Sequence, residues 1–155
     1  MKLVTFFLHG QARLGALLPG EAEQAVVDLN RADGSLPTDM IAFLEAGEAA
    51  RARAGQVLAA PPPEATYKLA EVVLKAPIPR PGKIICIGLN YVEHARESRI
   101  SVPPFPVIFS KYANSVVGHM EPIVIPGAVR EPDYEGELAA VIGRRGRRIP
   151  EARAL

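Results

Sequence analysis

The sequence is poor in cysteine and aromatic residues, contains no tryptophan and has almost no net charge. Cys86 is the one cysteine, so an intrachain disulfide is excluded, and we interpret it as a small buried residue in a reduced compartment. Eighteen Lys and Arg residues against seventeen Asp and Glu leave a charge of +1, too little to steer nucleic acid or an anionic membrane. No apolar run reaches the length of a membrane span. We therefore expect neither nucleic acid nor a membrane as a partner.

What the sequence does contain is typical of a soluble globular protein. Its 155 residues are 48% hydrophobic and 23% charged, enough for one modest domain or two small ones. The apolar run at the N-terminus ends after Leu8, and His9, Gln11 and Arg13 follow without a small-residue cleavage site. We interpret this run as a strand of a cytoplasmic protein and not as a signal peptide.

Residues 1–75 are expected to form a small N-terminal domain of β-strands and helix. Short apolar runs separated by His9–Gln11 and Pro19–Glu21 predict a β-meander. A segment rich in Ala, Glu and Arg, from Asp39 to about Ala60, predicts one interrupted helix or two short ones, and Pro61–Pro63 ends it. The strands of this domain are expected at Leu3–Leu8, Arg13–Leu18, Ala25–Leu29 and Leu69–Leu74.

Residues 76–155 are expected to form a second, β-rich domain, which gives a mixed α/β fold class that is mainly β. The proline-rich stretch Ala76–Gly82 predicts a stiff connector between the domains. The β-branched run Lys83–Gly88 predicts a strand buried on both faces, and a short helix is expected from Tyr91 to about Ser98. Further strands are expected at Val107–Lys111, Ile123–Ile125 and Asp133–Ile142.

The last of these predicted strands opens with three carboxylates. Asp133, Glu135 and Glu137 alternate with other residues, so on a strand they would project from one face, about 6 to 7 Å apart along the chain. Their mutual repulsion can be relieved by solvent, by the arginines of Arg144–Arg148, or by a hard cation such as Mg²⁺, Mn²⁺ or Ca²⁺. The pattern alone leaves these three explanations open.

The second candidate group lies on the short predicted helix. His94 and Glu97 are three residues apart and therefore share one helix face, where a carboxylate can orient and polarise an imidazole. Such a pair can take a proton from water, although an ordinary pair on a solvated surface has the same spacing. The helix is short and flanked by glycine and proline turns, which is typical of a mobile lid.

Four segments together resemble the fumarylacetoacetate hydrolase family, in particular bacterial fumarylpyruvate or acylpyruvate hydrolases and hydroxymuconate or heptadienedioate isomerases. Their order and spacing match across the second half of the chain, which is more specific than any one motif. The segments are Pro79–Tyr91, His94–Glu97, Pro106–Lys111 and Asp133–Leu138. Residues 1–70 are similar, more weakly, to the small N-terminal domain of many bacterial members.

This resemblance implies a role for each candidate residue. Glu135 and Glu137 correspond to carboxylates that bind a divalent metal, usually Mg²⁺, whereas the residue at the position of Asp133 does not bind it. His94 and Glu97 correspond to the water-activating pair on the lid. Lys111 corresponds to a lysine that commonly lies near the substrate, and a solvated lysine at the end of a strand is the alternative.

The resemblance also implies an activity. The expected reaction is hydrolysis of a C–C bond in a small 1,3-dicarbonyl or 2-oxo acid, such as an acylpyruvate, through a metal-stabilised enolate, in the catabolism of aromatic compounds. Isomerisation or decarboxylation of hydroxymuconate-type acids uses the same enolate and stays open. The full-length enzyme is expected to be a homodimer.

The sequence departs from the family pattern after Leu138. The aspartate that serves as the third metal ligand and a later substrate-contacting lysine have no counterpart before Leu155. We therefore expect an N-terminal part of a longer enzyme, inactive alone and prone to associate through unpaired strand edges. The alternative from another class is a non-catalytic metal-binding or assembly fragment.

Overall fold

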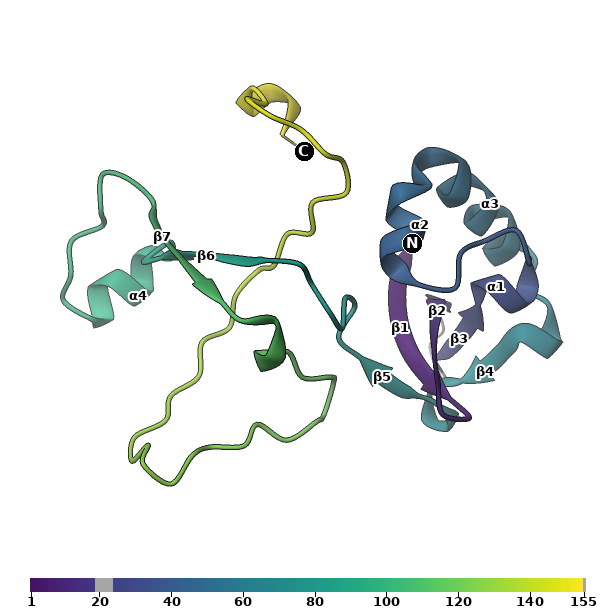
Figure 1. Ribbon diagram of the computed structural model, residues 1–155, viewed down its shortest axis with the longest axis horizontal. Coiled ribbons are helices and arrows are strands. Elements are labelled where there is room, and N and C mark those ends of the chain that lie inside the picture. The colour runs from purple at the N-terminus through teal and green to yellow at the C-terminus, as the bar shows by residue number, and fades with distance from the viewer. Residues whose placement is uncertain (19–23, 155) are drawn as a thin grey trace. The chain divides into compact units, whose positions relative to one another are not determined.

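A computed structural model describes residues 1–18 and 24–154 of the chain. The fold is mixed α/β and mostly sheet, which confirms the predicted class. Residues Met1–Ile78 and Gly118–Leu155 form one compact unit, unit 1, and Pro79–Val117 form a second, unit 2. Figure 1 labels the helices and strands. The division into folding domains at residues 75 and 76 stays a prediction, and the turn predicted at Pro19–Glu21 lies outside the described residues.

Unit 1 contains a five-stranded sheet in the order β4-β3-β2-β1-β5. Its antiparallel strands are β1 (Lys2–Leu8), β2 (Gln11–Leu18), β3 (Ala25–Asp28), β4 (Thr66–Lys68) and β5 (Val73–Lys75). The predicted β-meander is therefore confirmed as β1 to β3. The strand predicted at Leu69–Leu74 is shorter, because its first residues form the 3₁₀ turn η2 (Leu69–Glu71) before β5 begins.

Helices cover one face of this sheet. The predicted helical segment forms two helices, α2 (Met40–Glu45) and α3 (Gly47–Ala59), after the short α1 (Leu29–Ala32). The break between α2 and α3 falls at Ala46, and the next residue, Gly47, has a φ of 66°, which glycine adopts without steric cost. Leu14 and Ala16 of β2 pack with residues of all three helices, including Leu29, Phe43 and Ala54.

Phe6 of β1 lies on the opposite face from Leu14, because side chains alternate along a strand. It is fully buried, and its ring centroid is 6.4 Å from that of Tyr67. A Cβ on Gly15 would lie 2.8 Å from Phe6 and 2.7 Å from Val26. Gly15 therefore leaves the space in which these two side chains pack.

Unit 2 contains a two-stranded antiparallel sheet and one helix. The strands β6 (Ile84–Gly88) and β7 (Val107–Lys111) and the helix α4 (Val92–Glu97) confirm three predicted elements. The expectation that β6 is buried on both faces is wrong, since Ile85 is 65% exposed. The reason is that β7 is the one strand that pairs with β6 among the described residues, and a two-stranded sheet covers little of itself.

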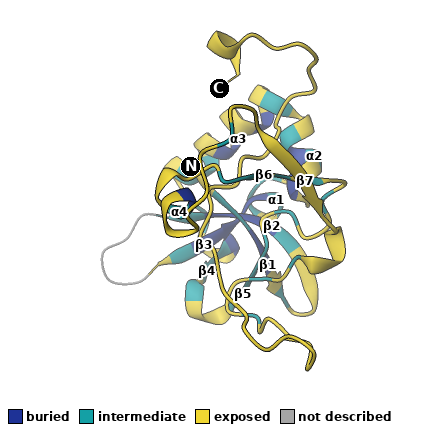
Figure 2. Cartoon of the chain, turned by 90° about the vertical axis from the view of Figure 1, so that its left-hand side faces the viewer, coloured by how far each residue is buried: buried dark blue, intermediate teal, exposed yellow. Residues whose placement is uncertain are grey.

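Residues 116–150 contain no helix or strand in the described structure. They lie between two 3₁₀ turns, η3 (Ala113–Ser115) and η4 (Glu151–Arg153). The strands predicted at Ile123–Ile125 and Asp133–Ile142 are therefore wrong for this structure. Strand formation needs a neighbouring strand to satisfy the backbone, and no described segment pairs with either. Figure 2 shows the result as a continuous exposed trace towards the C-terminus.

Candidate functional site

His94 and Glu97 lie on α4, which has a well-defined C-terminal end. The amide of Ile100 donates to the carbonyl of Ala95 at 2.9 Å, and that of Arg99 donates to Arg96 at 3.0 Å. Arg99 adopts a φ of 55°, so this is a Schellman motif with arginine in the left-handed position that usually holds glycine. The motif fixes the last turn of the helix, which carries both candidate residues.

The two residues of the pair differ in their exposure to solvent. His94 is half-buried and Glu97 is exposed, and Ala95 between them is the buried residue of the helix. The structure therefore places the two residues on one helix, three positions apart, as predicted. Glu93 and Arg96, with the same spacing, form an ion pair on this helix.

Lys111 is the last residue of β7 and is exposed. It pairs with Ile84 in the ladder between β6 and β7, so it belongs to the same unit as His94 and Glu97. Its role near a substrate stays a prediction.

Glu135 and Glu137 fall in unit 1, in the exposed segment without helix or strand. The structure thus divides the candidate residues between the units, with the proton-transfer pair and Lys111 in one and the carboxylates in the other. Asp133 is engaged locally, because its carboxylate accepts the amide proton of Tyr134 at 2.8 Å.

The carboxylates fit a divalent metal in chemistry but not in number. Carboxylate oxygens are the ligands that Mg²⁺ and Ca²⁺ prefer. In the described part of the chain, however, no three His, Cys, Asp or Glu side chains gather into a group that could hold a metal ion. Glu135 and Glu137 can therefore supply at most part of such a site.

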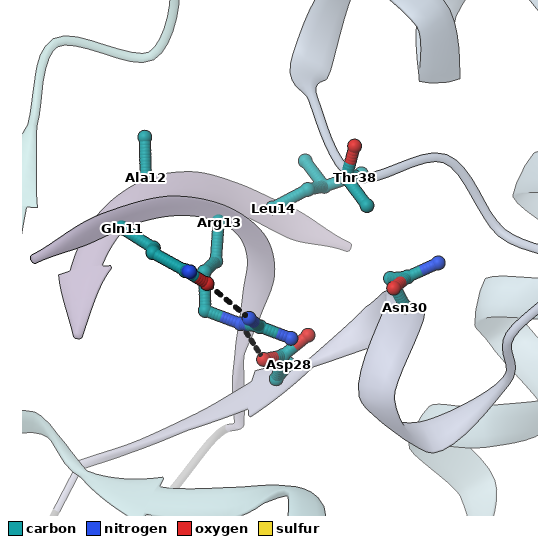
Figure 3. Close-up of a pocket in the computed structure, with 7 residues that line it drawn as sticks. All are labelled: Gln11, Ala12, Arg13, Leu14, Asp28, Asn30 and Thr38. Carbon is teal, nitrogen blue, oxygen red and sulfur yellow. Dashed lines mark hydrogen bonds and ion pairs between the residues drawn. The ribbon is translucent and has the colours of Figure 1, made fainter. Parts of the chain in front are cut away.

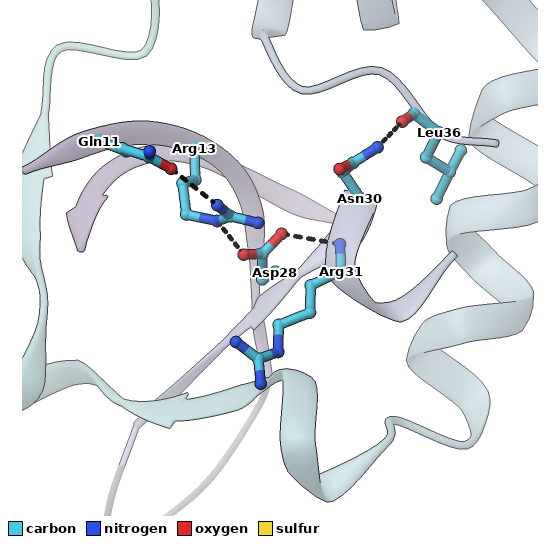
Figure 4. Close-up of polar contacts among 6 residues, drawn as sticks. All are labelled: Gln11, Arg13, Asp28, Asn30, Arg31 and Leu36. Atoms are coloured by element: carbon cyan, nitrogen blue, oxygen red, sulfur yellow. Dashed lines mark hydrogen bonds and ion pairs between the residues drawn. The ribbon is translucent and has the colours of Figure 1, made fainter. Parts of the chain in front are cut away.

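Unit 1 also has a pocket of about 370 Å³ that is lined mostly by polar residues (Figure 3). Asp28, fully buried, pairs with the guanidinium of Arg13 and accepts the amide proton of Arg31 at 3.0 Å (Figure 4). Asn30 donates to the carbonyl of Leu36 at 2.5 Å. These bonds join β2, β3 and α1, so they explain the polar residues of the pocket through folding, without a ligand.

Sequence reasoning missed this buried pair. Its signal was present, because Asp28 directly follows the apolar residues Val26 and Val27 and precedes Leu29, a position suited to a helix N-cap. A second ion pair, Lys75 with Glu121, joins residues 46 apart and has no local signal in the sequence.

The second half of the chain is similar to a known protein family. A family model described as "Fumarylacetoacetate (FAA) hydrolase C-terminal" matches residues 83–155. The chain belongs to the fumarylacetoacetate hydrolase family. The residues predicted from the sequence to carry the chemistry all lie inside the matched range: His94, Glu97, Lys111, Glu135 and Glu137.

Relatives of this fumarylacetoacetate hydrolase family member extend the match to the first half. "Oxaloacetate tautomerase FAHD2A, mitochondrial" from Homo sapiens is 44% identical over 130 residues, which cover 84% of this chain and 41% of that protein. "Fumarylacetoacetate hydrolase domain-containing protein 2 homolog" from Dictyostelium discoideum is 39% identical over 158 residues, with 100% and 50% covered. The chain thus spans half or less of the length of these relatives.

A solved structure shows the same fold. The crystal structure of a protein described as HpcE, from Mycobacterium smegmatis, superposes with a TM-score of 0.59 at 27% identity. The match covers 82% of this chain and 41% of that one. No helix in the described residues is long and apolar enough to cross a membrane.

Proposed function

We propose that this family member takes part in enolate chemistry on a small 2-oxo acid or 1,3-dicarbonyl compound. In this proposal His94 and Glu97 transfer the proton, Glu135 and Glu137 bind a divalent metal, and Lys111 contacts the substrate. The observation that supports it most is α4, whose Schellman motif holds the half-buried His94 and Glu97 in one defined turn. The activity is proposed for the whole protein, since the chain spans about two fifths of the length of its human relative.

The proposed step begins at the imidazole of His94. In the proposed step Glu97, one helical turn away, orients the ring and supplies a negative charge near it once it has accepted a proton. In hydrolysis the proton comes from water, whose hydroxide attacks the carbonyl carbon. The C–C bond then breaks, and its electron pair leaves as an enolate that is protonated at carbon.

The metal would be held in part by Glu135 and Glu137, with Mg²⁺ as the proposed ion and Mn²⁺ or Ca²⁺ as alternatives. When bound, such an ion polarises carbonyl oxygens and stabilises negative charge on an enolate. Because no three His, Cys, Asp or Glu side chains gather among the described residues, we expect the 155-residue chain alone to bind the ion weakly and to be inactive.

Two reactions of this class are candidates. Hydrolysis of an acylpyruvate-type C–C bond, in aromatic catabolism, is the first. Tautomerisation is the second, supported by the name oxaloacetate tautomerase that relatives at 42–45% identity carry. Tautomerisation needs the same base, which in this case takes the proton from carbon. Isomerisation or decarboxylation would also pass through the enolate. A homodimer and a cytoplasmic location stay proposals, and the human relative is named as mitochondrial.

The test uses the chain extended to the full length of the protein. Loss of enol ultraviolet absorbance is followed with oxaloacetate and with acetylpyruvate. We expect His94→Ala and Glu97→Gln each to lower kcat by about 10²- to 10⁴-fold, with the double variant no worse than the more severe single variant. Glu93→Gln, on the same helix, is the control and should retain activity. Additive or negligible losses would return His94 and Glu97 to the status of a surface pair.

Metal binding is tested separately by isothermal titration with Mg²⁺ or Mn²⁺. Glu135→Ala and Glu137→Ala should each remove most of the affinity, because each deletes an anionic ligand of a hard cation. Asp133→Ala should change it little. Equal losses at 133 and 135 would show that the carboxylates are assigned wrongly, and unchanged affinity in all three variants would favour the solvent-exposed interpretation.

A further inference from the structure

The chain leaves unit 1 after Ile78 and returns to it at Gly118. The intervening residues carry α4, and hence His94 and Glu97. β5 (Val73–Lys75) lies just before the exit, and Gly118–Glu121 lie just after the return. These two stems are far apart in sequence, but an ion pair joins them directly.

The carboxylate of Glu121 bridges the two stems with different oxygens. One oxygen accepts from Nζ of Lys75 on β5, and the other accepts from the backbone amide of Gly118 at 2.5 Å. The amide of Glu121 in turn donates to the carbonyl of Gly118 at 3.2 Å, which closes a tight turn. One side chain therefore fixes both the shape of the turn and its attachment to β5.

Lys75 is itself held in the sheet. It pairs with Thr5 of β1, and its ammonium lies 5.2 Å from the ring centroid of Phe7. The side chains of Lys75 and Glu121 are 26% and 34% exposed, so the pair is screened less than one on the open surface. The hydrogen bond from Lys75, followed by that from Gly118, lowers the pKa of Glu121.

Gly118 provides a second, independent sign that the return stem lies close against β5. A Cβ at this position would lie 3.2 Å from the carbonyl oxygen of Leu74 and 2.9 Å from Cδ of Glu121. A side chain here would require the Glu121 carboxylate to shift and would crowd the Leu74 carbonyl. The exit stem is also tied down, because the hydroxyl of Thr5 donates to the carbonyl of Pro77 at 2.7 Å.

We infer that Lys75 and Glu121 are positioning residues: they clamp together the two stems at which the chain leaves and re-enters unit 1, and so restrain both ends of the segment that carries His94 for the proposed enolate chemistry. This inference rests on the proposed function. The clamp restricts both ends of the segment Pro79–Val117 at once. Closing this loop lowers the conformational entropy of the segment in advance, so that less entropy has to be lost when His94 and Glu97 are positioned for the reaction.

The clamp is examined first as a structure, in the 155-residue chain. Hydrogen exchange of the Gly118–Glu121 amides should be at least about tenfold faster in Glu121→Gln and Lys75→Met than in the unmodified chain. Glu131→Gln, an exposed acid ten residues further along, should leave it unchanged. Unchanged exchange in the two clamp variants would overturn the inference at this stage.

The positioning role is then examined in the full-length protein. We expect Glu121→Gln and Lys75→Met to lower kcat by about tenfold with KM nearly unchanged, and the exchanged pair Lys75→Glu with Glu121→Lys to recover part of the loss. Thermal unfolding checks that the variants are folded. A loss of kcat that merely parallels the loss of Tm, and is not recovered in the exchanged pair, contradicts a positioning role. Full activity in both single variants of an active enzyme would overturn this inference while leaving the proposed function intact. An inactive unmodified enzyme would instead refute the proposed function, and the inference with it.

Discussion

Residues 1–78 bury their apolar side chains, whereas residues 79–154 expose most of theirs. Every buried hydrophobic residue in the described chain except Ala95 belongs to the first group. The second group exposes residues as large as Phe105, at 80%, and Leu138, at 89%. The family model matches within this exposed region, from residue 83 onward. The segments that carry the candidate chemistry are thus the ones whose apolar surface is not covered by the described residues.

The contrast teaches that composition does not determine burial. The run Lys83–Gly88 is as apolar as β1, but it pairs with one strand in the described structure, whereas β1 pairs with two. Burial depends on neighbours, and those of residues 1–78 lie within the same segment, where Leu14 packs with Phe43 and Ala54. We expect residues 79–154 to acquire theirs from further polypeptide.

The largest expected effect breaks the contrast at its centre. Phe43 is fully buried in the core of unit 1, so Phe43→Ala should lower the free energy of unfolding by about 3–5 kcal/mol. Phe109 on β7 is 48% exposed, so Phe109→Ala should change it by less than about 0.5 kcal/mol. Urea unfolding followed by circular dichroism measures both. Similar losses of stability in the two variants would mean that Phe109 on β7 is packed as tightly as Phe43 in the core of unit 1.

The next effect concerns the buried ion pair. Arg13→Met leaves the fully buried Asp28 without its cation and should cost about 3 kcal/mol. Adding Asp28→Asn should restore part of that loss, since it removes the unpaired charge. Arg31→Met is the matched control, because the exposed Arg31 bonds Asp28 through its backbone amide, which the substitution retains. A cost equal to that of Arg31→Met would show that the pair is not buried in solution.

A smaller effect concerns the exposed sheet of unit 2. Ile108 is 68% exposed on β7, so we expect the 155-residue chain to self-associate through this surface. Ile108→Lys should weaken the association by about tenfold, or about 1.4 kcal/mol, in sedimentation velocity. Ile41→Lys, an exposed isoleucine on α2, is the control and should have no effect. A monomeric unmodified chain would contradict this prediction.

The smallest effect is the pH dependence of one surface acid in unit 1. Hydrogen bonds from Ser35, and then Arg53, lower the pKa of Asp33. A lowered folded pKa stabilises the protein above the unfolded pKa, and the contribution is lost as pH falls through the folded pKa. Asp33→Asn should therefore be slightly less stable at neutral pH and equal in strong acid. A difference that persists in acid would point to a lost hydrogen bond, not to charge.

Sequence reasoning was most successful where structure is local. The strands β1 to β3 and the helices α2 and α3 follow from apolar runs, turn residues and the composition between Asp39 and Ala60. The helix α4 and the strands β6 and β7 follow from the same local signals, whereas the pairing of β6 with β7 is known only from the structure. The position of His94 relative to Glu97 depends only on that helix.

It failed where structure depends on distant partners. The apolar run after Glu137 reads as a strand, but a strand exists only when another pairs with it, and no described residues do so. For the same reason the sequence could not show whether Glu135 and Glu137 approach His94. The Lys75–Glu121 pair is a further case, since neither residue lies in a motif.

The most direct test of the contrast is native-state hydrogen exchange across the 155-residue chain. The amides of β1, β2 and α3 should exchange only through global unfolding, because these elements form the well-packed core of unit 1. Those of residues 122–150 should exchange almost as fast as in an unfolded peptide, and the β6–β7 ladder should fall between. Protection at residues 133–142 equal to that of β1 would contradict the account, because it would mean that the carboxylate segment already forms a paired strand within this chain.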